Sequence, residues 1–99
     1  MYEFGLSDEE RKLVIAMLNV AAPGGMTIDE MDFRINAITV ISQTRTGPYI
    51  MDAPAYERML AALAAFRYNA VNIEARQMVR RLQALQPKLE LVADQEGSG

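Results

Sequence analysis

The apolar positions near the start of the chain recur at helical spacing. Within residues 7–22 they fall three and four positions apart, which places them on one side of a helix. This stripe consists of Leu13, Val14, Met17, Leu18 and Ala21, and Ile15 lies outside it. Ser7 followed by Glu10 is the capping-box pattern that begins a helix, and Pro-Gly-Gly at residues 23–25 ends it. The pattern predicts a first helix over residues 7–22.

A second helix is predicted over residues 27–44, because Thr27 and Glu30 repeat the same capping pattern. This helix carries apolar side chains on two sides. The first stripe consists of Ile28, Met31, Ile35, Ile38 and the less apolar Ser42, and the second of Phe33, Ala37 and Val40. The β-branched run 38–41 lowers helix propensity, so the last turns are the least well defined.

The segment that follows breaks the helical pattern. Gly47-Pro48 interrupts it and leaves residues 48–51 as a short extended stretch, too short for an independent sheet. Pro54 suits the first turn of a helix, so a third helix is predicted over residues 54–68.

The C-terminal part is predicted to form a further helix and a tail. Asn69 and Asn72 favour a kink or short turn, because asparagine tolerates the left-handed conformation and caps helices. A fourth helix over residues 72–86 then ends at Pro87, which cannot donate a backbone hydrogen bond. Residues 88–99 are expected to form a flexible acidic tail.

These elements predict an all-α fold, a compact bundle of three to four helices. Helices one and two form an antiparallel hairpin that packs against the C-terminal helices. A chain of 99 residues fits a single domain, expected over residues 1–87. Because so small a domain buries a limited core, self-association as a homo-oligomer is expected to help its stability.

The composition excludes most common active sites. The chain has no cysteine and no histidine, which removes disulfides, zinc fingers, iron–sulfur ligation and Cys or His nucleophiles. A Gly-rich phosphate loop and a nucleophile elbow are also missing, so we expect no enzyme and no cofactor. Asp29, Glu30 and Asp32 are explained by the dipole at a helix start, so no metal site is expected.

Hydropathy and charge limit where in the cell the protein is expected and which partners it is expected to bind. No apolar run spans a membrane, and acidic residues precede the first hydrophobic stretch, so neither a membrane segment nor a secretory signal is expected. A cytoplasmic location fits this pattern. The net charge of −3 argues against non-specific nucleic-acid binding, which depends on lysine and arginine.

Two groups of side chains are candidates for a binding site. Aromatic side chains in the irregular segments and apolar side chains beyond one core predict a protein interface, although the aromatic arm can also pack on its own bundle. The interface candidates are Tyr2, Phe4, Ile15, Phe33, Val40, Tyr49 and Tyr56. The basic candidates are Arg67, Arg76, Arg80 and Arg81. They are suited to an anion, to an acidic partner surface, to the acidic start of the first helix, or to solvent alone.

The stretch LSDEERKLVIAMLNVAAPGGMTIDEM resembles the first half of winged-helix transcription regulators, over about a quarter of the chain. The resemblance implies DNA binding, but DFRINAITVISQT continues without the break and the basic recognition helix of that family. We therefore expect a non-enzymatic protein-interaction module, an adaptor, structural component or inhibitor of a larger machine, such as a phage or bacterial accessory protein. The alternative is a DNA-binding regulator of helix-turn-helix or winged-helix type.

Overall fold

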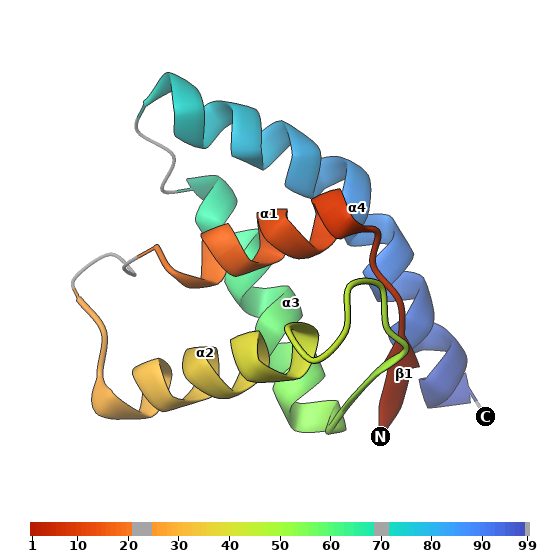
Figure 1. The fold of residues 1–99 in the computed structure, drawn as a ribbon. Helices are drawn as coiled ribbons and strands as arrows, with labels where there is room; N and C mark the ends of the chain where they lie inside the picture. The colour runs from red at the N-terminus through yellow and green to blue at the C-terminus, as the bar shows by residue number, and fades with distance from the viewer. Residues whose placement is uncertain (21–24, 69–71, 99) are drawn as a thin grey trace.

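The computed structural model describes residues 1–20, 25–68 and 72–98. Over these ranges the chain forms four helices and two short strands, which confirms the all-α bundle with a short extended segment (Figure 1). In chain order the elements are β1 (Tyr2–Phe4), α1 (Asp8–Leu18), α2 (Ile28–Ile41), β2 (Tyr49–Met51), α3 (Ala53–Tyr68) and α4 (Ile73–Ser98).

Helix α1 lies in the middle of the bundle and contacts the three other helices. In Figure 1, α1 and α2 run side by side in opposite directions, as the predicted hairpin requires, and α4 lies on the far side of α1 from α2. Helix α1 ends at Leu18, earlier than the predicted residue 22, and the hinge residues 21–24 lie outside the described residues.

The N-terminal arm pairs with the short extended segment after α2. Strand β1 runs antiparallel to β2, with Tyr2 opposite Met51 and Phe4 opposite Tyr49. Gly47 precedes β2 with φ +94°, and a β-carbon at this position would lie 3.1 Å from the carbonyl oxygen of Phe4. Glycine therefore allows the chain to turn tightly against the arm.

Aromatic side chains from the arm and from α3 form one end of the core. The ring of Tyr56 lies 4.9 Å from that of Tyr2 and 5.0 Å from that of Phe4, both edge to face. The Tyr56 hydroxyl is buried and donates a hydrogen bond of 2.7 Å to the backbone carbonyl of Leu89. Tyr49 packs on Phe4 from β2, with the ring centroids 5.4 Å apart. The arm is thus part of the protomer core.

The break between α3 and α4 is confirmed. Helix α3 ends at Tyr68, and α4 begins after Asn72, whose Oδ1 accepts a hydrogen bond of 2.7 Å from the backbone N–H of Ala75. Asn72 therefore caps the start of α4, as its side chain predicts. Asn69 lies outside the described residues.

The prediction that a helix ends at Pro87 is wrong. Helix α4 passes through Pro87 and continues to Ser98, so residues 88–98 are helical and do not form a flexible tail. Tertiary contacts outweigh the hydrogen bond that proline cannot make. Leu89 is fully buried, and Lys88 Nζ lies 2.9 Å from Glu10 Oε1 at the start of α1.

Candidate functional site

Helix α2 turns one of its two apolar stripes into the core. Phe33, Ala37 and Ile41 are buried, and Val40 is half-buried against them. Phe33, a predicted interface residue, therefore lies in the protomer's own core, and Val40, predicted with it, packs against the same core. The second stripe of the sequence is the inner face of this helix.

The other stripe of α2 faces outward. Ile28, Met31 and Ile35 are 80%, 48% and 57% exposed, and Ile38 is half-buried at the end of the same row. We call these four residues the α2 stripe. Because they are spaced by three, four and three positions, they form one continuous apolar row along the helix. A row of this kind is a candidate interaction surface.

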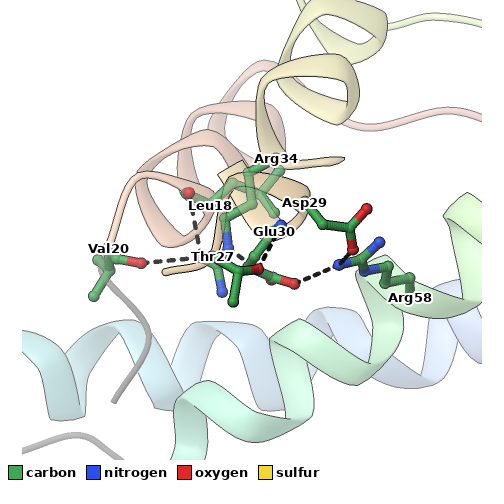
Figure 2. Close-up of polar contacts among 7 residues, drawn as sticks. All are labelled: Leu18, Val20, Thr27, Asp29, Glu30, Arg34 and Arg58. Atoms are coloured by element: carbon green, nitrogen blue, oxygen red, sulfur yellow. Dashed lines mark hydrogen bonds and ion pairs between the residues drawn. The ribbon is translucent and has the colours of Figure 1, made fainter. Parts of the chain in front are cut away.

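A buried arginine fixes how α2 sits on α1 (Figure 2). The side chain of Arg34 is only 10% exposed. Its Nη1 donates to the carbonyl oxygens of Leu18 and Val20, at 3.3 Å and 2.9 Å, and its Nε donates to Glu30 Oε1 at 3.0 Å. Carbonyls at a helix C-terminus carry partial negative charge without a partner inside the helix. Arg34 therefore caps α1 from the neighbouring helix.

A second arginine ties α2 to α3. Arg58 Nη2 lies 2.7 Å from Glu30 Oε2 and 2.8 Å from Asp29 Oδ2 (Figure 2), and its guanidinium lies 4.6 Å from the centre of the Phe33 ring. Glu30 is thus held by two arginines, and the hydrogen bond from Arg58 lowers the pKa of this carboxyl. The backbone N–H of Glu30 donates to the Thr27 hydroxyl at 3.1 Å, which begins the helix.

This ion network sets the rotation of α2 about its own axis. Arg34 reaches the end of α1 only if Phe33 and Ala37 face the core, and that rotation places the α2 stripe in solvent. Each charged side chain of the network pairs with another protein group. No cluster of three His, Cys, Asp or Glu side chains suited to a metal ion occurs among the residues the structure describes.

The remaining interface candidates lie inside or against the protomer core. Phe4, Tyr49 and Tyr56 are buried, while Tyr2 and Ile15 are half-buried and pack against the core. The three buried aromatics, which were predicted to contact a partner, lie in the protomer core, because pairing of β1 with β2 encloses them. Of the two alternatives for the aromatic arm, packing on its own bundle is the one observed.

The basic candidates lie on α4. Arg76, Arg80 and Arg81 are exposed, and the side chain of Arg67 lies outside the described residues. The acidic start of α1 does not pair with these arginines in the described part of the chain. Its carboxylates pair instead with Arg11, Lys12, Arg45 and Lys88.

A groove of about 770 Å³ lies between α1 and α4. Its floor is apolar, with Leu13, Met78 and Leu85, and its rim carries Lys12 and Arg81 together with acidic side chains of α1. The rim therefore mixes both signs of charge and selects no class of ligand.

Acidic pH is expected to destabilise the fold through three carboxyls. Hydrogen bonds from Arg11 and then Lys12 lower the pKa of Asp8 to about 2. Burial raises the pKa of Glu10, but bonds from the Ser7 backbone and Lys88 outweigh it, so the net shift is downward. Glu30 is shifted in the same direction by Arg58. Each folded carboxyl thus holds its proton less tightly than the unfolded one.

Because the unfolded chain binds more protons, stability contributed by these groups is present above the unfolded pKa and is lost as the pH falls through the folded pKa. We expect the urea midpoint to be flat near neutral pH and to fall between about pH 5 and about pH 2. The variant Glu30→Gln should start from a lower midpoint and lose less of it over that range. A wild-type midpoint that stays constant or rises on acidification contradicts this assignment.

Comparisons with known proteins leave the function to be argued from this geometry. No protein-family model matches the chain, and neither curated proteins nor solved structures give a match. None of the helices in the described ranges is both long and apolar enough to cross a membrane.

Proposed function

We propose that this domain is a non-enzymatic protein-interaction module that binds its partner through the α2 stripe. The supporting observation is the exposure of Ile28, Met31 and Ile35 in one row on a helix held by the ion pairs of Arg34 and Arg58. Single exposed apolar side chains are common on protein surfaces, whereas a continuous row marks a contact with another protein. An adaptor, a structural component or an inhibitor of a larger machine fits this chemistry.

The distribution of the other exposed apolar side chains supports the same choice. In the described ranges, the remaining large ones lie singly, and the two that share an element, both on α4, are 18 residues apart. They are Met1, Val20, Ile50, Ile73 and Leu91. Helix α2 therefore offers the densest apolar surface.

The nucleic-acid alternative has less support. The part of the chain that resembles winged-helix regulators forms α1 and the start of α2, and the exposed surface of α2 there combines apolar side chains with Asp29 and Asp32. Such a surface repels phosphate. The exposed arginines lie on α4, and the net charge of the chain is −3.

Site-specific photo-crosslinking tests the proposed function. A benzophenone amino acid replaces Ile35 in one variant and Ile73, which is 74% exposed on α4, in a matched control. Both variants are irradiated as pure protein and in extract of the native host cell. We expect covalent adducts with protein from position 35 and few from position 73. If position 35 yields no adduct with any protein, this chain included, the proposed function is wrong.

A further inference from the structure

The first turns of α2 are attached to the rest of the protomer without a buried side chain. Residues 25–32 are each exposed or half-buried, and the first buried residue of the helix is Phe33. In the described ranges, the hydrogen bonds and ion pairs that join residues 25–32 to another element all run to Arg58 of α3 (Figure 2). This part of α2 is therefore held by ion pairs, whereas the part from Phe33 onward is held by apolar packing.

The start of α1 has an apolar anchor that the start of α2 lacks. Ser7 caps α1 in a closed capping box, and Leu6 directly before it is buried in the core. Thr27 caps α2 by the same hydroxyl contact, but the Glu30 carboxylate binds two arginines. Met26, which corresponds to Leu6, is only half-buried. Because a packed apolar residue before the cap fixes how the chain enters a helix, the start of α2 is the less firmly held of the two.

The contacts of Arg58 are weaker than a packed core. The side chains of Arg58 and Asp29 are 39% and 81% exposed, so water and salt screen their attraction. An ion pair at such exposure shifts an equilibrium by no more than about fivefold. Segments with few buried apolar contacts open locally at a lower free energy than the whole fold. Residues 28–32 are therefore expected to open before the rest of α2.

We propose that residues 28–32 form an ionic latch, a segment that closes on Arg58 and opens while the rest of the protomer stays folded. Opening breaks both ion pairs of Arg58 and the pair between Arg34 and Glu30. Arg34 keeps its two carbonyl partners at the end of α1, and Phe33 stays in the core. The inner face of α2 therefore keeps its place when the latch opens.

The latch changes the length of the α2 stripe. When it opens, Ile28 and Met31 leave the row, and only Ile35 and Ile38 remain on the helix. The consequence for binding rests on the proposed function, because it takes this stripe as the binding surface. A closed latch completes the row, so conditions that screen Arg58 weaken the binding of a partner. Arg58 is thus a positioning residue for the stripe.

Amide hydrogen exchange of the full chain, read by NMR, tests the latch. Opening of residues 28–32 removes the helical acceptors of the N–H groups of residues 32–34, whereas those of residues 38–41 keep theirs. In wild type we expect residues 32–34 to exchange at least about tenfold faster than residues 38–41 after correction for intrinsic rates. Raising sodium chloride from about 0.1 M to about 1 M should accelerate residues 32–34 severalfold and leave residues 38–41 unchanged.

A charge-removing variant and its matched control identify the cause. Arg58→Met keeps an apolar stem over Phe33 and removes the ion pairs, so residues 32–34 should exchange about tenfold faster than in wild type, with less than about a twofold change at residues 38–41. Lys88→Met removes another half-exposed cation, which pairs with Glu10 in the first turn of α1. It should leave the exchange of residues 32–34 unchanged. Circular dichroism establishes that both variants are folded.

Two results overturn the latch. If residues 32–34 and 38–41 exchange at equal rates in wild type and in Arg58→Met, α2 opens only as a whole. If residues 32–34 exchange fast but respond neither to salt nor to Arg58→Met, their exchange is ordinary fraying of a helix end. The exchange experiment contains no partner, and photo-crosslinking at position 35 does not depend on exchange rates. Failure of the latch is therefore distinguishable from failure of the proposed function.

Discussion

Replacing Arg34 by methionine is expected to lower the free energy of unfolding by about 2–3 kcal/mol. The side chain donates three hydrogen bonds from a nearly buried position, and each is worth roughly 1 kcal/mol when both partners are desolvated. Methionine keeps much of the apolar volume and removes the donors. The carbonyls of Leu18 and Val20 then lose their partner, while Glu30 retains Arg58.

The matched control is Arg76→Met, the same change at an exposed arginine of α4, which should alter stability by less than about 0.5 kcal/mol. Urea unfolding followed by circular dichroism gives both values. Loss of the Arg34 contacts also frees α2 to rotate, so Arg34→Met should lower the photo-crosslinking yield from position 35 even where the protein remains folded. Equal stability of the two variants would show that the network does not anchor α2.

The helix starts were predictable because their signals are local. Ser7 and Glu10 form both bonds of a capping box, with Glu10 N–H donating to the Ser7 hydroxyl at 3.1 Å and Ser7 N–H to the Glu10 carboxylate at 2.7 Å. At α2 the hydroxyl of Thr27 accepts from the backbone of Glu30, as predicted, but the Glu30 carboxylate turns to two arginines. One of them, Arg58, is far away in sequence. The residues around Thr27 therefore could not predict where the Glu30 carboxylate binds.

The outward face of α2 was not predictable for the same reason. Both stripes of α2 are apolar and helically spaced, so periodicity alone does not decide which one enters the core. The choice is made by Arg34, whose partners are the carbonyls of Val20 and Leu18 at and just after the end of α1, fourteen and sixteen residues earlier. The burial of Phe4 likewise depends on pairing between strands that lie 45 residues apart at Phe4 and Tyr49.

The continuation of α4 past Pro87 shows local propensity overruled by packing. Proline removes one backbone hydrogen-bond donor, which is why the sequence predicts that the helix ends at Pro87. Here the turn after it is held on two sides. Lys88 pairs with Glu10 of α1, and the hydroxyl of Tyr56 on α3 binds the carbonyl of Leu89. The side chain of Leu89, with no exposed surface, adds an apolar anchor between these polar contacts.

Replacing Leu89 by alanine tests whether this last segment stabilises the fold. We expect the free energy of unfolding to fall by about 2–4 kcal/mol, because the side chain is fully buried and its loss leaves a cavity. The substitution keeps the backbone carbonyl that accepts from Tyr56, so the measured loss reports side-chain packing alone.

Leu91→Ala is the matched control, since it makes the same change two residues further along the same helix, where the side chain is 55% exposed. Its cost should stay below about 1 kcal/mol, and both values come from urea unfolding at neutral pH. A tail that began after Pro87 would make the two substitutions equally harmless. A large difference between them places the turn after Pro87 inside the cooperative unit, so that α1, α3 and the end of α4 unfold together.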